Sequence, residues 1–300
     1  MIVEDHVGPW LQSQGPFFCP PLPVRIFPFF RDMAKIAMNT GEVLERSPVL
    51  PLLRDVGIRA GEMGFDSYAV GGIVRDLLLR RATLDADVVI EGDGIAFASR
   101  FSAERNATLT RYDRFMTATL VLPDGSKVDV ATARKEVYER PAALPLVRPG
   151  SIRDDLFRRD FTINTLAVCL NPDRFGEMID LFQGRDDIRK GSIRILHEKS
   201  FIDDPTRIFR AVRFERRFGF TMEDATERRA REAVSAGLMQ KLSGYRIASE
   251  LRLISKEEDP GSVVTRLEEL DVLFFLAEKG KRHKEVRQLL RRMKDGERSV

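Results

Sequence analysis

The chain has 300 residues, of which 43% are hydrophobic and 32% charged, and its formal net charge at pH 7 is +3. These values are typical of a soluble globular protein that is long enough for two domains of ordinary size. Only two cysteines and three scattered histidines are present, which argues against a disulfide framework and against a zinc site. The small net charge does not indicate a nucleic-acid partner, so local clusters of arginine are more informative.

No apolar run is long enough to span a bilayer, and the N-terminal sequence MIVEDHVGPW lacks the basic start and apolar core of a signal peptide. Together with the low cysteine content, these features predict a cytoplasmic protein without a membrane partner. The sequence does not indicate an oligomeric state.

Residues 1–45 are rich in proline and phenylalanine, as in the segment GPFFCPPLPVRIFPFF. The prolines at positions 16, 20, 21, 23 and 28 exclude a regular helix or a central strand, so we expect an extension or linker. A helix is predicted over residues 48–64, where apolar residues recur and Gly64 ends the run.

The stretch from Tyr68 to Gly92, YAVGGIVRDLLLRRATLDADVVIEG, carries the first chemical signal. A short strand over residues 68–70 leads through two glycines into a helix over residues 73–80, and a second strand then carries two aspartates. Because side chains alternate along a strand, Asp85 and Asp87 project from the same side.

Two adjacent carboxylates repel each other unless a cation lies between them, and oxygen ligands suit Mg²⁺ held together with substrate phosphates. Gly72 allows a phosphate to approach the backbone, and the helix that follows points amide donors at it. Arg75 is placed to reach the same anion. An isolated Asp-x-Asp is more often a surface turn, so it is the combination that predicts a nucleoside triphosphate site with its metal.

A helix is predicted over residues 95–105, followed by a strand over residues 117–122, a turn and a returning strand over residues 127–131. The returning strand carries Asp129, which is either a third carboxylate of the metal site or an ordinary exposed strand residue.

The proline-containing segment 134–148 is predicted to be a mobile loop. Residues 151–169 are predicted to be helical, with Ser151 and Asp154 at the spacing of a capping box. Within this helix, Arg158, Arg159 and Asp160 are costly to place against a core unless they are paired. Arg159 either forms a surface ion pair with Asp155 or contacts the ribose or a phosphate of a nucleotide.

The run SFIDDPTRIFRAVRFERRFGF over residues 200–220 predicts a helix that has Asp204 as its N-cap and a proline at its first position. Arg207, Arg210 and Arg213 recur every three residues and share the arc opposite the apolar side chains. We therefore expect three guanidinium groups directed away from the buried face. The ordinary interpretation is a solvated basic face, and the alternative is an anion site.

The register of Asp204 with Arg207 places a hydrogen-bond acceptor beside a donor. Adenine and cytosine each present an amino donor beside a ring-nitrogen acceptor, whereas guanine and uracil present a carbonyl acceptor beside an N–H donor. The two side chains are thus suited to accept A or C and to reject G and U by leaving buried polar groups unpaired.

The motifs occur in an order that resembles a known family. The strand, glycine pair, helix and Asp-x-Asp strand resemble the first motif of the DNA polymerase β-like nucleotidyltransferases, in particular the bacterial class II tRNA nucleotidyltransferase and poly(A) polymerase family. Residues 158–165 resemble the family's RRDFTxNA, with Thr165 in place of alanine. Residues 203–207 resemble its base-reading motif Glu-Asp-x-x-Arg, with Asp203 in place of glutamate.

Two further segments resemble family motifs that brace the domains. Residues 170–184 end in an apolar-Asp-apolar segment that contains Asp180, and residues 242–251 contain an arginine and a glutamate that correspond to those of the last motif. Within the family, the branch that adds the terminal A, or acts as separate CC-adding and A-adding enzymes, is the most similar.

The resemblance implies an α+β fold: a polymerase β-like nucleotidyltransferase head with a mixed sheet and helices over residues 46–185, then an all-helical neck over residues 186–276 that binds nucleotide and RNA. Residues 277–300 would form a basic C-terminal helix or tail. The implied activity is template-independent addition of AMP from ATP to the 3′ end of tRNA, with Mg²⁺ as cofactor and pyrophosphate as product. Use of CTP as a second substrate stays open.

The implied residue roles follow the same motifs. Asp85 and Asp87 would hold the metal, and Asp129 would join them as a catalytic residue. Gly72 and Arg75 would hold the triphosphate, and Arg159 the ribose or a phosphate. Asp204 and Arg207 would read the base, and Arg210 and Arg213 would position the nucleotide.

Three alternatives are kept. The first is a poly(A) polymerase, and the second is an enzyme that adds CC or the whole CCA. The third is a nucleotide- or RNA-binding fragment without turnover, because family members usually continue past the neck into helices that hold the tRNA, whereas this sequence stops at Val300.

Overall fold

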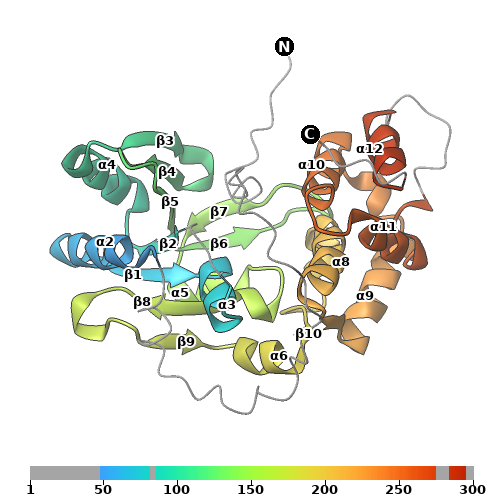
Figure 1. Cartoon of the computed structure of the whole chain (residues 1–300), viewed down its shortest axis with the longest axis horizontal. Helices are drawn as coiled ribbons and strands as arrows, with labels where there is room; N and C mark the ends of the chain where they lie inside the picture. Colours follow the sequence, from blue (N-terminus) through green and yellow to red (C-terminus); the bar gives the residue numbers. More distant parts are fainter. Residues whose placement is uncertain (1–47, 82–85, 275–283, 295–300) are drawn as a thin grey trace. The chain divides into compact units, whose positions relative to one another are not determined.

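The computed structural model describes residues 48–81, 86–274 and 284–294 (Figure 1). The predicted extension over residues 1–45 and the catalytic candidate Asp85 lie outside these ranges. The described chain forms two compact units. The first holds the described residues up to Lys135 together with Val147–Leu156 and Asn164–Leu181. The second holds Glu136–Leu146, Phe157–Ile163 and the described residues from Phe182 onward.

The first unit is built on a seven-stranded sheet with the strand order β3-β4-β5-β2-β1-β8-β9. Strands β2 and β5 are parallel, and the other neighbouring pairs are antiparallel. A mixed sheet with helices confirms the expected fold class. The strands are β1 (Asp66–Val70), β2 (Ala86–Glu91), β3 (Thr108–Tyr112), β4 (Thr117–Val121), β5 (Lys127–Thr132), β8 (Leu166–Cys169) and β9 (Met178–Asp180).

The central strands of this sheet are apolar because both of their faces are covered. Val88, Val89 and Ile90 of β2 are fully buried, as is every residue of β8. Figure 1 shows helices α2 (Leu50–Glu62) and α4 (Gly94–Arg105) beside the sheet, where they pack on β1 and on β4 and β5. The short helix α3 (Gly72–Leu78) packs on β1 and β8. The predicted helices over residues 48–64, 73–80 and 95–105 are thus confirmed.

Two sequence predictions in the middle of the chain are wrong. The segment predicted as a loop contains a strand pair, β6 (Arg134–Val137) and β7 (Leu146–Pro149). The helix predicted over residues 151–169 ends early, because α5 spans only Ile152–Phe157 and residues 166–169 form strand β8. The apolar run LAVC is compatible with either element, and pairing with β1 and β9 decides for the strand.

The capping box at the start of α5 is confirmed. Ser151 donates through its backbone N–H (2.9 Å) and its hydroxyl (2.7 Å) to Oδ2 of Asp154, whose own N–H donates to the Ser151 hydroxyl at 3.3 Å. These reciprocal bonds satisfy amides that a helix N-terminus would otherwise leave unpaired.

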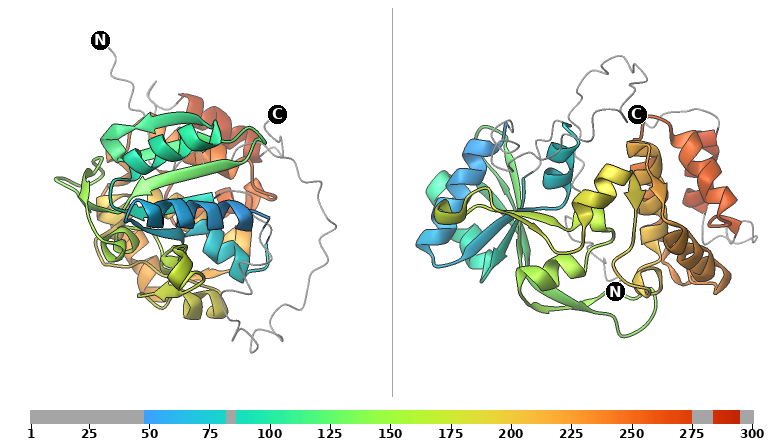
Figure 2. Two further views of the ribbon diagram at one scale, coloured as in Figure 1. Left: turned by 90° about the vertical axis from the view of Figure 1, so that its left-hand side faces the viewer. Right: turned by 90° about the horizontal axis from the view of Figure 1, so that it is seen from below.

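The second unit is mostly helical, as its helices in Figure 2 show. It also contains the short parallel strands β10 (Ser192–Ile193) and β11 (Thr221–Met222), so it is not entirely helical as expected. Helix α8 contacts both α10 and α11 and forms the centre of the unit. The helices are α6 (Gly184–Lys190), α7 (Ser200–Asp203), α8 (Thr206–Phe218), α9 (Asp224–Ser235), α10 (Gly244–Ile254), α11 (Pro260–Glu269) and α12 (Lys284–Lys294).

The expectation that α8 presents a solvated basic face is wrong. All residues from Thr206 to Glu215 except Arg210 are buried, so two of the three arginines lie inside the unit. Helices pack around α8 on more than one side, and the buried guanidinium groups are held by an acid or by uncharged acceptors, as described below.

None of the described helices has both the length and the apolar character to cross a bilayer.

Candidate functional site

Asp87 and Asp129 lie opposite each other on two adjacent strands of the first unit. In the parallel pairing of β2 with β5, Asp87 is the register partner of Asp129. Paired residues in a sheet project from the same face, so the two carboxylates are neighbours there. The expectation that the returning strand brings Asp129 beside the Asp-x-Asp strand is therefore confirmed.

Asp129 is held by two side chains of the same sheet. Thr119 on β4 donates its hydroxyl to Oδ1 of Asp129 at 2.6 Å, and the ammonium of Lys127 donates to Oδ2 at 2.7 Å. The Asp129 side chain is only 4% exposed. It is therefore not the ordinary exposed strand residue of the alternative reading, and its orientation is fixed through both oxygens.

Gly72, Arg75 and Asp87 meet at one place. A Cβ atom on Gly72 would lie 3.8 Å from a terminal nitrogen of Arg75 and 3.9 Å from Oδ2 of Asp87. Gly71, directly before α3, has a φ of +67°, which an L side chain rarely adopts, so the turn between β1 and α3 favours glycine there.

Arg75 is buried, and its guanidinium is oriented by neighbours within the unit. It donates to Oδ1 of Asp76 at 2.9 Å and to Oδ1 of Asn164 at 2.5 Å. These bonds fix the guanidinium beside the turn that contains Gly72. The backbone at Gly72 carries no side chain in this space, so the arrangement leaves room for a ligand atom beside the Asp87 carboxylate.

The donor chemistry of this place fits a hard divalent cation such as Mg²⁺, because Asp87 and Asp129 offer carboxylate oxygens from neighbouring strands. Among residues 48–81, 86–274 and 284–294, no group of three or more His, Cys, Asp or Glu side chains gathers as a metal site. The third predicted acid, Asp85, lies outside those ranges.

Asp204 in the second unit is fixed by three donors. Its Oδ1 accepts hydrogen bonds from the backbone N–H of Thr206 at 2.9 Å and from its hydroxyl at 2.5 Å, and it forms an ion pair with Arg246 at 2.6 Å. Burial would raise the pKa of Asp204, but the guanidiniums of Arg246 and Arg207 outweigh it and hold this pKa below its usual value. Asp204 is thus an ionised acceptor at neutral pH.

Arg207 is held in the same unit by uncharged acceptors. Its guanidinium donates to the hydroxyl of Ser200 at 2.7 Å and to the backbone carbonyl of Arg158 at 2.7 Å. Arg158 is in turn paired with Glu136 at 2.9 Å. Hydrogen bonds thus fix the orientation of Arg207, and its pairing with Asp204 in base reading stays a prediction.

Arg210 and Arg213 each have an acidic partner. Arg210 donates to Oδ2 of Asp160 at 2.7 Å, and Arg213 lies 3.4 Å from Oε1 of Glu257. Burial would lower the pKa of Arg210, yet Asp160 and Glu250 raise it, whereas burial lowers the pKa of Arg213 to about 10. Arg213 stays charged at neutral pH, but its side chain is 3% exposed and faces the interior.

Glu250 on α10 completes this cluster of charges. It is 1% exposed, and burial raises its pKa even though Arg210 and Arg213 act in the opposite direction. Arg159 lies in the turn that follows α5 and is partly exposed. Because α5 ends at Phe157, Arg159 and Asp155 do not share a helix, and the spacing argument for their ion pair does not apply.

Comparison with known proteins adds independent information. Residues 67–194 match the model of the poly A polymerase head domain. The chain is 47% identical over 229 residues to an A-adding tRNA nucleotidyltransferase of Geobacter sulfurreducens, and 42% identical over 225 residues to one of Halalkalibacterium halodurans. A solved structure of the Thermotoga maritima CCA-adding enzyme complexed with tRNA has a TM-score of 0.72 and 41% identity.

The chain belongs to the tRNA nucleotidyltransferase and poly(A) polymerase family. The two relatives are matched over 76% and 74% of this chain, which spans 26% and 53% of their own lengths. The solved structure covers 81% of this chain, which spans 56% of it. The described units thus correspond to part of longer family members.

Seen as a member of this family, the chain has supporting residues that sequence reasoning missed. Thr119 and Lys127 were not singled out, although the hairpin prediction placed them beside Asp129. Arg158 was read only as part of a charged run, and its backbone carbonyl holds Arg207. Arg246 was noted within a motif, but no spacing indicates that it pairs with a residue 42 positions earlier.

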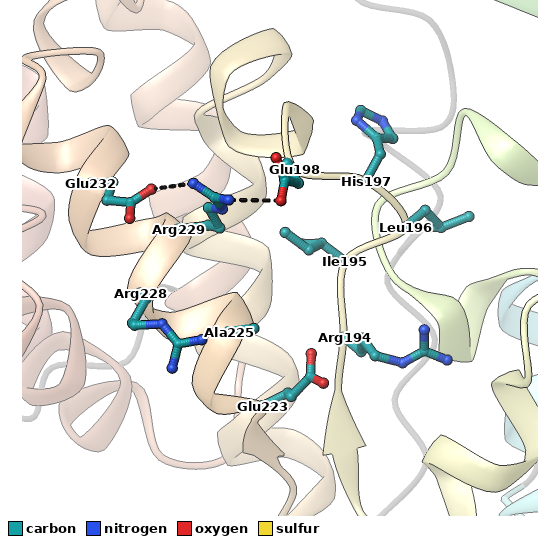
Figure 3. Close-up of a pocket in the computed structure, with 10 residues that line it drawn as sticks. All are labelled: Arg194, Ile195, Leu196, His197, Glu198, Glu223, Ala225, Arg228, Arg229 and Glu232. Carbon is teal, nitrogen blue, oxygen red and sulfur yellow. Dashed lines mark hydrogen bonds and ion pairs between the residues drawn. The ribbon is translucent and has the colours of Figure 1, made fainter.

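A pocket of about 420 Å³ in the second unit contains none of the predicted site residues (Figure 3). Figure 3 shows Arg229 between Glu198 and Glu232, with which it forms ion pairs of 2.7 and 2.8 Å. His197 lines the same pocket, and burial together with the charge of Arg207 lowers its pKa. The ion pairs occupy acids and bases alike, so the pocket shows no preference for one charge.

Proposed function

We propose that the protein is a template-independent RNA nucleotidyltransferase that transfers AMP from ATP to the 3′ end of tRNA and releases pyrophosphate. The observation that carries this proposal is the register pairing of Asp87 with Asp129 beside Gly72 and Arg75. The A-adding assignment is supported by the names of the two similar relatives. We place the reaction in the cytoplasm.

The first unit would hold the triphosphate and its metal. Asp87 and Asp129, with Asp85, would hold Mg²⁺, which when bound lowers the pKa of the RNA 3′-hydroxyl and neutralises charge on the departing pyrophosphate. Thr119 keeps the Asp129 carboxylate in a fixed orientation. Gly72 leaves the backbone open to a phosphate, and Arg75 supplies charged donors for it.

The second unit would read the base. Asp204, kept ionised by Arg246 and Arg207, accepts from the amino group of adenine. Arg207 donates to the adjacent ring nitrogen through N–H groups not used by Ser200 and the Arg158 carbonyl. Guanine would place a carbonyl against a carboxylate and an N–H against a guanidinium, which leaves desolvated groups unpaired.

The other residues have supporting roles. Arg159, partly exposed, would contact the ribose or a phosphate. Arg210 would position the nucleotide while Asp160 orients its guanidinium. Arg213 faces Glu257 in the interior, so its contribution is to hold α8 against the connection between α10 and α11.

Addition of C is the second candidate, because cytosine presents the same donor and acceptor order as adenine. The similar Thermotoga maritima enzyme is named as CCA-adding, and the motif that reads the base here has Asp203 where the family has glutamate. Poly(A) synthesis uses the same chemistry and differs only in where addition stops.

A gel assay with labelled tRNA separates these candidates. tRNA ending in CC and tRNA lacking CC are each incubated with the protein, Mg²⁺ and one triphosphate at a time. We expect a single A to be added to the CC end from ATP, and no addition of C to the shorter tRNA. Addition of C would move the protein to the CCA-adding branch, and a long ladder from ATP would make it a poly(A) polymerase.

The control is Asp87→Asn, which removes one metal-binding charge at constant shape. It should lose extension while its circular dichroism spectrum matches that of the wild type. If the wild type extends neither tRNA, or if the variant extends as well as the wild type, the proposal fails.

A further inference from the structure

The ammonium group of Lys127 contacts Asp129, one of the carboxylates proposed to bind the metal. Its ammonium lies 2.7 Å from Oδ2 of Asp129, while the hydroxyl of Thr119 lies 2.6 Å from Oδ1. Both oxygens of Asp129 are therefore occupied by groups of the sheet itself. Neither contact was predicted from the sequence, and the reaction outlined above gives Lys127 no task.

The two partners of Asp129 differ in how easily they can leave. Thr119 is its direct cross-strand neighbour, so the hydroxyl is placed by the backbone pairing. Lys127 is two residues away on the same strand, at the end of a flexible side chain that is 35% exposed, whereas the Asp129 side chain is 4% exposed. The ammonium can therefore move to water while Thr119 keeps the carboxylate in place.

Charge balance gives the ammonium a purpose. Asp87 and Asp129 are register partners on adjacent strands. Two neighbouring carboxylates repel each other unless a cation offsets their charge. A divalent cation held by both carboxylates would repel the ammonium at Oδ2, because two positive charges would then lie at one carboxylate.

We propose that Lys127 is a resident counter-ion that competes with Mg²⁺ for Asp129 and so lowers the affinity of the site for metal alone. Metal would then bind well only with a triphosphate, whose own oxygens complete its ligands. This inference rests on the proposed function in that it places Asp129 at the metal. Lys127 is a positioning residue here and contacts no reacting atom.

The test is metal binding without RNA or nucleotide, so that it does not depend on turnover. Mn²⁺ binding is followed by electron paramagnetic resonance, and Mg²⁺ binding by calorimetry, for wild type, Lys127→Met and Lys127→Arg. We expect Lys127→Met to bind metal about two- to fivefold more tightly, the range set by the strength of a partly exposed ion pair. Lys127→Arg keeps the competing charge and should stay near the wild type.

A second pair of variants keeps the test decisive. In the Asp129→Asn background, Lys127→Met should no longer change metal affinity, because the shared carboxylate is gone. Equal or weaker metal binding by Lys127→Met alone, or the same gain in both backgrounds, would overturn the inference. If Lys127→Met does not fold, Lys127→Gln is measured in the same way.

The thermal response distinguishes competition from simple support of the fold. Without metal, Lys127→Met should unfold at a lower temperature than the wild type, and added Mg²⁺ should raise its midpoint by more than it raises that of the wild type. An equal rise in both would mean that the ion pair is structural only. If Lys127→Met binds metal more tightly than the wild type, but the wild type transfers no AMP to tRNA, the proposed function is refuted and this inference stands.

Discussion

Arg246 on helix α10 and Asp204, two residues before helix α8, form an ion pair of 2.6 Å, although they are 42 residues apart in the chain. The same guanidinium donates to the backbone carbonyl of Ala142 at 2.8 Å. One side chain thus joins the acceptor proposed for base reading to the segment that connects β6 with β7.

Replacing Arg246 by methionine should therefore impair nucleotide choice without removing the acceptor. We expect the Michaelis constant for ATP to rise several-fold and the preference for ATP over GTP to fall, because Asp204 loses the charge that orients it. Arg246→Lys keeps the charge but not the forked geometry, so its preference for ATP over GTP should lie between those of the wild type and the methionine variant. A methionine variant with unchanged selectivity would mean that Thr206 alone fixes Asp204.

Arg207→Ala should relax the choice of base. The loss of one hydrogen bond from a charged donor is worth roughly 1.5–3 kcal/mol, so the ratio of ATP to GTP incorporation should drop by about tenfold or more. Single-nucleotide extension of labelled tRNA with each triphosphate measures that ratio. If it does not change, Arg207 does not read the base, and its bonds to Ser200 and the Arg158 carbonyl are its whole role.

Gly72→Ala should affect nucleotide binding and leave the fold intact. The added methyl group would meet Arg75 and Asp87 at 3.8 and 3.9 Å, which are ordinary contact distances. It would fill the space through which a phosphate approaches the backbone, so we expect a higher Michaelis constant for ATP with an unchanged unfolding midpoint. Equal kinetics in both proteins would show that the triphosphate lies elsewhere.

Gly57 and Gly61 on α2 make a matched pair for stability. A Cβ on Gly57 would lie 1.8 Å from the carbonyl oxygen of Leu170, whereas one on Gly61 would come no closer than 3.7 Å to its neighbours. Gly57→Ala should therefore destabilise the protein by about 1–3 kcal/mol or more, since backbone must move. Gly61→Ala should be neutral or stabilising by up to about 1 kcal/mol in urea unfolding.

The low pKa of Asp204 makes a prediction for acid stability. Its pKa is held below the unfolded value of about 3.9 by Arg246 and Arg207 against the effect of burial, so its contribution to stability is fully present above that pH. That contribution is lost as pH falls through the folded pKa. The stability difference between wild type and Asp204→Asn should be constant near neutrality and shrink below about pH 4. A difference that grows on acidification would contradict the assigned direction.

The structural features that depend on residues close together in the sequence are the most predictable. The glycine turn, the hairpin that carries Asp129 and the helix that begins after Asp204 all follow from local rules, and the family resemblance supplied the mixed sheet. Strand β8 was read as helix because LAVC has no period of its own, and only its neighbours β1 and β9 define it.

The surroundings of the arginines could not be predicted in the same way. A spacing of three residues places Arg207, Arg210 and Arg213 on one arc of a helix, but it does not say whether that arc faces water or other helices. The answer depends on acids far away in the chain, such as Asp160 and Glu257. Such long-range pairs are set by packing and carry no local sequence pattern.

The interleaving of the two units has a consequence for how this protein can be divided. Arg207 and Arg210 lie beyond residue 182, but the Arg158 carbonyl and Asp160 that hold them belong to a segment upstream, between two segments of the first unit. A gene fragment beginning at Phe182 would thus encode the arginines without the Arg158 carbonyl and Asp160. Exchange of parts between relatives at that junction would mismatch them, so the two units are expected to be inherited, truncated or recombined only together.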